Sequence, residues 1–221
     1  ALDGEVVLLA YTLLETLGLT DLELHLNSVG CPNCRAAYRK ALQEYFRPHL
    51  EKMCTDCKSR FERNPLRLLD CKNEYDAEIS KDAPNIINYL DDDCRTHFES
   101  VQRFLTAAKV PFIIDLRLVR GLDYYTKTAF EIKYLPLGAQ SAVAGGGRYD
   151  GLVQEIGGPA IPGIGFAVGL ERALLALEKQ ALLKSNAEYI DVFFVALGDA
   201  AQLHAFSLLD AARKRGLKAQ M

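Results

Sequence analysis

The stretch Leu118-Val-Arg-Gly-Leu-Asp-Tyr-Tyr-Thr-Lys-Thr-Ala-Phe-Glu131 joins two strand-like segments of the chain. Residues 110–115 predict a buried strand, and residues 124–134 contain enough β-branched and aromatic side chains to predict another. Gly121 interrupts the pattern between them, so Arg120 is expected where the two strands meet. The residues alone leave two explanations for Arg120: a ligand-binding guanidinium, or an arginine that caps a hairpin and pairs with a nearby aspartate.

A second stretch, Ser141-Ala-Val-Ala-Gly-Gly-Gly-Arg-Tyr-Asp-Gly151, places three glycines in a row at Gly145, Gly146 and Gly147. It predicts a glycine-rich loop after a short strand. The spacing is not G-x-G-x-x-G, and no Walker lysine follows, which excludes dinucleotide-binding and P-loop interpretations. Glycines let a backbone approach a ligand closely, whereas an isolated loop of this kind is more often a tight hairpin.

Residues 161–179 predict a strand, a turn and a helix. The step Gly169-Leu-Glu-Arg172 puts Arg172 in the first turn of that helix, where free N–H groups and the positive end of the dipole attract anions. An arginine is unfavourable there unless an anion is bound. Arg172 is therefore a candidate phosphate ligand, and an ion pair with Glu171 or Asp150 is the structural alternative.

Taken together, these stretches resemble the histidyl-tRNA synthetases, a family of class II aminoacyl-tRNA synthetases. Residues 118–131 match the histidine-specific signature without a gap, residues 145–152 match a loop that borders the adenylate pocket, and Gly-Leu-Glu-Arg matches the third motif of the class. The resemblance implies that Arg120 contacts the histidine carboxylate and the α-phosphate of ATP, and that Arg172 holds the γ-phosphate. The residues that it implies for the histidine site are Arg120, Tyr124, Tyr125, Gly145, Gly146, Gly147 and Tyr149.

Residues 31–109 predict a mostly helical segment of uneven charge. Residues 33–72 carry ten Lys and Arg against five Asp and Glu, and residues 73–100 carry two against eight. On charge alone, a solvated helical surface and an RNA-facing surface are equally good explanations. The resemblance favours the second, because synthetases of this family carry a mostly helical insertion here that faces the tRNA acceptor stem.

The six cysteines include two C-x2-C pairs, Cys31-Pro-Asn-Cys34 and Cys54-Thr-Asp-Cys57, in the spacing of a four-cysteine zinc site. A helix between the pairs would separate them by roughly 18 Å, because each helical residue advances the chain by ~1.5 Å. A second quartet would join the later pair to Cys71 and Cys94. The alternative is six reduced thiols that pack as small hydrophobes, which we favour, so zinc is possible but not expected.

Both ends of the chain predict regular structure. Residues 5–17 predict a helix and residues 22–27 a strand, in which His25 is interpreted as a packed or surface histidine and not a ligand. Residues 190–197 predict an apolar strand and residues 200–215 an amphipathic helix, and a parallel partner strand is expected to begin at Leu217. This last α/β unit resembles the start of the anticodon-binding domain of the same enzymes.

The expected fold class is therefore α+β. We expect an antiparallel-sheet class II catalytic core over residues 1–30 and 110–184, a helical insertion over residues 31–109, and the start of an α/β anticodon-binding domain over residues 188–221. A linker is expected at residues 185–187.

The composition limits the class of protein. A hydrophobic content of 49% over 221 residues is enough for real cores, and a net charge of −3 does not by itself indicate nucleic-acid binding. No apolar run approaches the ~20 residues of a membrane span, and no leader precedes Ala1, so we predict a cytoplasmic protein without membrane contact. A start without methionine and a stop at Met221 just after a helix are expected for a piece of a longer protein.

The function that the resemblance implies is activation of histidine with ATP and Mg²⁺ to histidyl-adenylate, and transfer of the histidyl group to tRNA(His) by a homodimer. The first step needs positive charge, magnesium and alignment more than a general base, which suits a site of arginine, tyrosine and glycine. The first two motifs of the class are absent from this sequence, so we expect the chain alone to be inactive.

Two other functions would explain part of the sequence. A regulatory paralogue of the synthetase fold would bind histidine and control ATP phosphoribosyltransferase, but such paralogues usually degrade the signatures that are present here. A stand-alone zinc-binding RNA module would explain the cysteines but not the second half of the chain.

Overall fold

The computed structural model describes residues 1–119, 124–183 and 189–221 of the chain. These form two compact units, Ala1–Leu182 and Leu183–Met221. Arg120, the central residue of the predicted signature, lies outside the described residues. Among the helices that the structure describes, none combines the length and apolar character needed to cross a bilayer.

A five-stranded sheet forms the centre of the first unit, with its strands in the order β2-β1-β3-β4-β5. β1 runs parallel to β2, and the other pairings in this sheet are antiparallel. A mostly antiparallel sheet with helices confirms the predicted α+β fold class. The strands are β1 (Leu22–Ser28), β2 (Ile113–Ile114), β3 (Thr126–Tyr134), β4 (Ala142–Arg148) and β5 (Ile164–Val168).

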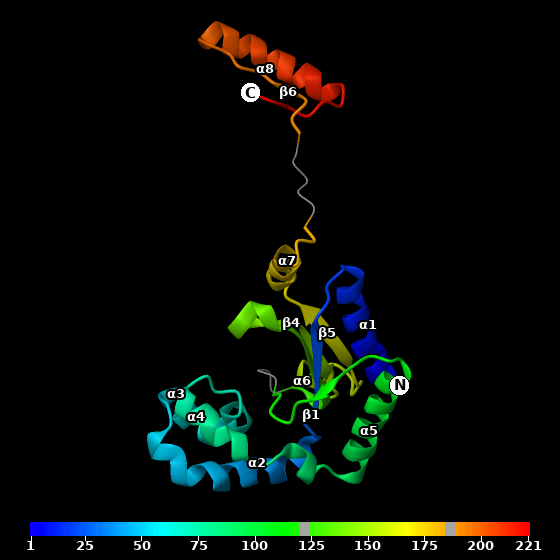
Figure 1. Ribbon diagram of the computed structural model, residues 1–221, viewed down its shortest axis with the longest axis vertical. Helices are drawn as coiled ribbons and strands as arrows, with labels where there is room; N and C mark the ends of the chain where they lie inside the picture. The colour runs from blue at the N-terminus through cyan, green and yellow to red at the C-terminus, as the bar shows by residue number, and fades with distance from the viewer. Residues whose placement is uncertain (120–123, 184–188) are drawn as a thin grey trace. The chain divides into compact units, whose positions relative to one another are not determined.

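Helices α1 (Leu2–Thr16) and α5 (Asp92–Ala107) pack against each other and cover one face of this sheet (Figure 1). Both carry acidic residues in the first turn, which favours a helix N-terminus because the dipole is positive there. Buried and half-buried side chains alternate along the second half of β3, as expected for a strand with one covered face. The core between helices and sheet includes Val7, Leu14, Leu24, Leu26, Leu105, Phe130 and Ile132.

The segment between β1 and α5 is mostly helical, as predicted, and has a second hydrophobic core of its own. Tyr38, Leu42 and Phe46 recur every four residues and face this core, which makes α2 amphipathic. Pro48 lies in the 3-10 turn that follows α2, because proline cannot continue a regular helix. The elements are α2 (Pro32–Phe46), η1 (Arg47–Lys52), α3 (Thr55–Arg63), η2 (Pro65–Leu68), α4 (Glu74–Ile79), η3 (Ser80–Asp82) and η4 (Ile86–Tyr89).

Three short elements after β3 complete the first unit. η5 (Leu135–Gln140) connects β3 to β4, α6 (Leu152–Glu155) follows β4, and α7 (Leu170–Lys179) begins directly after β5. Because α7 begins at the end of β5, its first turn lies beside the sheet. Arg172 belongs to that turn, as predicted.

The second unit is a small parallel α/β arrangement. β6 (Val192–Phe193) pairs in parallel with β7 (Ala219–Gln220), and α8 (Asp199–Lys214) connects them. Gly216 follows α8 with a φ of 83°, a left-handed conformation that glycine adopts without strain. The parallel partner expected after Leu217 is therefore confirmed, although the paired part of the first strand is much shorter than residues 190–197.

Two predictions about strands were wrong. Only Ile113 and Ile114 of residues 110–115 form a strand, and both are exposed, because β2 pairs with β1 alone at the edge of the sheet. The three glycines are not a loop but the middle of β4, which is paired with β3 on one side and with β5 on the other. Glycine has low strand propensity, so the local sequence predicted the wrong element.

A buried carboxylate on the covered face of the sheet connects α1 to α5, β3 and β4. Asp3 of α1 is 2% exposed and accepts hydrogen bonds from Thr128 Oγ1 at 2.5 Å and Arg148 Nε at 3.0 Å. His97 Nε2 of α5 lies 3.2 Å from the same carboxylate, and Arg148 also pairs with Asp150 at 2.8 Å. Burial alone would raise the pKa of Asp3, but the hydrogen bonds with His97, Arg148 and Thr128 outweigh it and hold the pKa well below its ordinary value of 3.8.

We expect Asp3→Asn to lower the free energy of unfolding at pH 7 by ~3–5 kcal/mol, because removing one partner of a buried ion pair leaves the other charge poorly compensated. A carboxyl with a lowered folded-state pKa stabilises the protein above its unfolded pKa, and this contribution is lost as pH falls through the folded value. The difference between wild type and variant should therefore shrink below about pH 4. Urea unfolding at several pH values measures it.

Asp21→Asn is the matched control, because Asp21 is exposed and bonds only to the neighbouring hydroxyl of Thr20 among its described contacts. Its effect should stay within ~0.5 kcal/mol. Equal effects of the two substitutions at pH 7 would contradict a structural role for the Asp3 network.

Candidate active site

The face of the sheet opposite α1 and α5 carries charged side chains. Glu131 and Lys133 of β3 are half-buried there, whereas the adjacent Phe130 and Ile132 point into the core and are fully buried. Glu131 lies opposite His25 of β1 in the antiparallel register, so the same face continues across both strands. The sheet thus has one apolar face, which is covered by α1 and α5, and one polar face.

His25 is the centre of a charged cluster on this face. Its Nδ1 lies 2.8 Å from Asp115 Oδ2 and its Nε2 lies 3.0 Å from Glu23 Oε2, while Lys133 Nζ is 3.4 Å from Asp115 Oδ2. Burial alone would raise the pKa of Asp115, but the hydrogen bond with His25 and the charge of Lys133 outweigh it and lower the pKa. Asp115 is therefore a carboxylate at neutral pH. His25 is partly buried and hydrogen-bonded, which agrees with its interpretation as a packed or surface histidine.

Two cavities among the described residues contain predicted site residues, and the larger of these two has a volume of about 600 Å³ and is lined mainly by polar groups. Its charged lining residues are the cations Lys72, Arg117, Lys133 and Arg172 and the acids Asp70, Asp115 and Glu131. Cations of this kind fit phosphate oxygens, and the carboxylates offer the oxygen ligands that Mg²⁺ prefers. The residues present therefore fit a nucleotide phosphate chain with a magnesium ion.

Arg172 reaches this cavity from the first turn of α7. Its Nη1 donates a hydrogen bond to the backbone carbonyl of Ala142 at 2.8 Å. Within the described residues it forms no ion pair with Glu171 or Asp150, and Asp150 pairs with Arg148 instead. The structural alternative for Arg172 is therefore not observed, and the guanidinium keeps further donors for a ligand.

The smaller cavity has a volume of about 400 Å³ and lies between the insertion and the tyrosine signature. Tyr125 lines it together with Val29 and with three arginines of the insertion, Arg35, Arg39 and Arg63. Arg39 Nη2 donates to the carbonyl of Arg63 at 2.8 Å, which holds α2 against the end of α3. An aromatic wall facing several guanidinium groups suits a small ligand that has both a ring and a negative charge.

Val119 lines both cavities. The two cavities therefore meet at the segment that directly precedes Arg120 in the sequence.

Three predicted tyrosines gather in one cluster. The ring centroids of Tyr124 and Tyr125 are 4.7 Å apart, and Tyr149 meets Tyr124 edge to face at 6.1 Å. Tyr125 is buried against Val29 and Ala129. Such aromatic contacts hold rings in fixed positions, so Tyr125 presents a defined wall to the smaller cavity.

Glycine permits the close packing around these rings. A Cβ on Gly147 would lie 2.4 Å from the carbonyl oxygen of Thr128 and 2.8 Å from the Tyr125 ring. A Cβ on Gly146 would lie 2.2 Å from the carbonyl oxygen of Gly165 on the adjacent strand. Gly147 is thus part of the tyrosine cluster, whereas Gly146 is required by the β4–β5 pairing. Gly145 lies opposite Glu131 in the register.

The predicted site residues are only partly brought together. Tyr124, Tyr125, Gly147 and Tyr149 form one group, Arg172 lines the other cavity, and Arg120 lies outside the described residues. Sequence reasoning missed Arg117 and Lys133, as well as the three arginines of the insertion. For Lys133 a signal existed, since the period-2 alternation of residues 130–134 puts Glu131 and Lys133 on the face opposite Phe130 and Ile132.

The cysteines form two groups that differ from both predicted quartets. Each C-x2-C pair meets a different third cysteine and an aspartate, and the four ligand atoms of each group lie within 4.8 Å of one another. Neither quartet forms because α2 separates the two pairs, and because α5 brings Cys94 to the first pair and not to the second. The groups are Cys31, Cys34, Asp91 and Cys94, and Cys54, Cys57, Cys71 and Asp76.

The family model described as histidyl-tRNA synthetase matches residues 1–173. A histidine–tRNA ligase of Desulforamulus reducens is 51% identical over 220 residues, covering 100% of this chain and 52% of the relative. The solved structure of apo S. aureus histidyl-tRNA synthetase matches with a TM-score of 0.67 at 37% identity, over 99% of this chain and 54% of that one.

A more distant solved structure shares the fold alone. It is described as an ATP phosphoribosyltransferase regulatory subunit/histidyl-tRNA synthetase from Bacillus halodurans, and it matches with a TM-score of 0.54 at 22% identity, over 99% of this chain and 58% of that one. The chain spans about half the length of the curated relatives that it matches.

The sheet with its glycine-rich strand β4 and the following arginine-bearing helix α7 is that of a class II aminoacyl-tRNA synthetase. Within this class, the chain belongs to the histidyl-tRNA synthetase family.

We expect Gly147→Ala to destabilise the protein by ~1–3 kcal/mol, because an added methyl group must displace the Thr128 carbonyl or the Tyr125 ring. Gly151→Ala is the control, since a Cβ there meets no atom within 4 Å. Thermal unfolding of both variants compares them directly. A Gly147→Ala variant as stable as the control would contradict the close approach of Tyr125 to β4.

Proposed function

We propose that the longer protein to which this chain belongs is a histidine–tRNA ligase, which activates histidine with ATP and transfers it to tRNA(His). The observation that carries this proposal is the meeting of the two cavities at Val119, with Tyr125 on one side and Arg172 on the other. An amino acid and a nucleotide bound in these cavities would have their reacting groups at the segment that leads into Arg120.

The smaller cavity is proposed to hold histidine. The hydroxyl of Tyr125 gives this wall a polar group, and a pocket that distinguishes an imidazole from other rings must do so by hydrogen bonds. Tyr124, Tyr149 and Gly147 hold the Tyr125 ring in place, and Gly145 and Gly146 shape the strand behind it. Arg120 is proposed to contact the histidine carboxylate, in the role that the family resemblance gives it.

The larger cavity is proposed to hold the phosphate chain of ATP. Arg172 lines this cavity and is proposed to hold the γ-phosphate, and Arg117 and Lys133 add positive charge along the same cavity. Mg²⁺ bound there would neutralise phosphate charge, and Glu131 and Asp115 offer carboxylate ligands for it.

Catalysis in this arrangement depends on alignment and charge. Attack of the histidine carboxylate on the α-phosphorus forms the mixed anhydride, breaks the bond between the α- and β-phosphates and releases pyrophosphate. This attack requires two negatively charged groups to approach each other. The planar guanidinium of Arg120 could bond to both at once, which lysine cannot do with the same geometry. Cations fixed before the reaction stabilise charge in the transition state without reorganisation.

The remaining parts of the chain are proposed to serve tRNA. Residues 31–109, with their own hydrophobic core, form the insertion that faces the acceptor stem, between core segments 1–30 and 110–184. Residues 188–221 form the start of the anticodon-binding domain, and the compact unit Leu183–Met221 supports this division. A homodimer and a cytoplasmic location stay predictions.

The second candidate function is regulation of ATP phosphoribosyltransferase by a histidine-binding paralogue. The 22% identical structure shares only the fold, whereas the 51% identical relative is a histidine–tRNA ligase, so ligase activity is the better supported proposal.

Amino-acid-dependent exchange of pyrophosphate into ATP tests the proposal on the full-length protein. We expect exchange with histidine and at least ~100-fold less with other amino acids, because a site built around hydrogen bonds rejects ligands that lack the partner group. Histidine binding without any exchange would instead identify a regulatory protein.

Substitutions in each cavity should separate the two substrates. Tyr125→Phe should raise the KM for histidine more than the KM for ATP, since a lost hydrogen bond to a polar ligand group costs ~1–3 kcal/mol. Arg172→Lys should do the reverse, because lysine keeps the charge but loses the planar donors. If both variants changed both KM values equally, the two cavities would not be separate subsites.

A further inference from the structure

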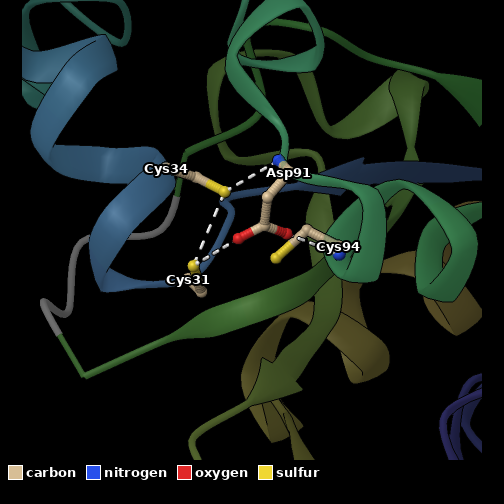
Figure 2. A group of neighbouring side chains, drawn as sticks. All are labelled: Cys31, Cys34, Asp91 and Cys94. Atoms are coloured by element: carbon tan, nitrogen blue, oxygen red, sulfur yellow. Dashed lines mark hydrogen bonds between the residues drawn. The ribbon is translucent and has the colours of Figure 1, made fainter.

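Two clusters of thiols and carboxylates lie in the insertion. None of their residues is among those proposed to bind histidine or ATP, although Cys71 also lines the larger cavity. Figure 2 shows the first, in which Cys31, Cys34, Asp91 and Cys94 converge from the start of α2 and the start of α5. Cys31 Sγ lies 3.5 Å from Cys34 Sγ and 3.1 Å from Asp91 Oδ2. The backbone N–H groups of Asp91 and Cys94 point into the same cluster.

The second cluster has the same composition. Cys54 Sγ lies 3.7 Å from Cys71 Sγ, and Cys71 Sγ lies 3.3 Å from Asp76 Oδ2. Cys57 and Asp76 are completely buried. Three thiols and one carboxylate therefore meet twice in a segment of fewer than seventy residues.

Helix geometry explains the spacing of these residues. Cys31, Cys54 and Asp91 are the N-cap residues of α2, α3 and α5, and Cys34, Cys57 and Cys94 follow three positions later in the same helices. The N-cap and third helical positions place their side chains together at the helix end. A spacing of two residues between these positions therefore directs two ligand groups from the start of each helix to one point.

Asp76 has no cationic partner among the described residues. Its buried carboxylate accepts hydrogen bonds from the backbone N–H of Cys54 and from the thiol of Cys71, which carry no net positive charge. A buried carboxylate without a cation is costly, and three more polar groups facing it do not supply positive charge. A divalent cation bound among these four groups would supply it.

The distances fit zinc. A tetrahedral ion with Zn–S bonds of about 2.3 Å holds its sulfur atoms roughly 3.8 Å apart, and sulfur and oxygen ligands slightly closer. The Sγ–Sγ separations of 3.5 and 3.7 Å are close to this value. Thiolates select zinc over magnesium or calcium, and four ligands without an open position are typical of a structural site.

We propose that each cluster binds one Zn²⁺ ion through three thiolates and one aspartate. Three N–H···S hydrogen bonds already point at the sulfur atoms, from Asp91 to Cys34, from Cys57 to Cys54 and from Asn73 to Cys71. Such bonds and the positive helix ends stabilise the negative charge that thiolates keep after coordination.

The first ion would connect the insertion to the histidine cavity. Cys31 and Asp91 stand where the insertion leaves β1 and where it returns through α5, so one ion would fasten both ends. Pro32 and Arg35, in the first turn of α2, line the cavity with Tyr125. The second ion would fasten the start of α3 to the loop before α4. Both ions would hold helices that pack around the second hydrophobic core.

Elemental analysis of the full chain, purified with a phosphine reductant and without chelator, tests the proposal. We expect two zinc ions per chain, one for each cluster. Cys94→Ser should lower this to one by disrupting the first cluster, and Cys57→Ser should do the same at the second, so that each variant is the control for the other. The double variant should bind none.

Cobalt substitution of the wild-type chain gives a second measurement that does not depend on how the variants fold. Two equivalents of Co²⁺ should produce the intense visible absorption of tetrahedral thiolate sites, and added Zn²⁺ should abolish it. Absence of bound metal, together with no cobalt spectrum from a chain whose six thiols are reduced, would overturn the proposal. A chain that contains disulfides between clustered cysteines as purified would overturn it equally.

Discussion

Strand β3 is paired along both edges, with β1 on one side and β4 on the other, and this double pairing fixes which side chains face each side of the sheet. A shift of one residue would exchange the two faces, placing Glu131 in the apolar core and Phe130 in the cavity. Burial of Phe130 and Ile132 under α1 and α5 opposes such a shift. The polar face on which the proposed site lies is therefore a consequence of the core on the other face.

Charge reinforces this division. On the covered face, Asp3 is neutralised by Arg148 and stays inside, so the carboxylate holds α1 to β4. On the open face, Asp115 and Glu131 lie among Arg117, Lys133 and Arg172 around a cavity, where water or a ligand can enter. The same residue types thus hold the fold together on one side and remain available to a ligand on the other.

Helices were the most predictable part of the fold. The mostly helical segment over residues 31–109, the helix over residues 200–215 and the arginine in the first turn of α7 were predicted from local signals, and each was confirmed. The strand β4 was not predictable from local preference, because its three glycines are held in a sheet only by β3 and β5. The exposure of β2 likewise depends on its place at the sheet edge, which its own isoleucines do not reveal.

The site was predictable in part. Tyr124, Tyr125 and Tyr149 come from two recognisable stretches, and their contact follows from the pairing of β3 with β4. The grouping of Cys94 with Cys31 depends on where α5 returns to the sheet, sixty residues later, and spacing within the pairs cannot show it. Arg35, Arg39 and Arg63 enter the smaller cavity for the same reason: the insertion folds back over the tyrosine signature.

We propose that the two cavities are the two halves of one reaction site. A crystal structure of the full-length protein with histidine and a non-hydrolysable ATP analogue would locate both ligands. We expect histidine against Tyr125 in the smaller cavity and the phosphates beside Arg172 in the larger one, with the carboxylate and the α-phosphate meeting next to Val119. Histidine bound elsewhere, or a phosphate chain that does not approach Arg172, would show that the two cavities do not form one site.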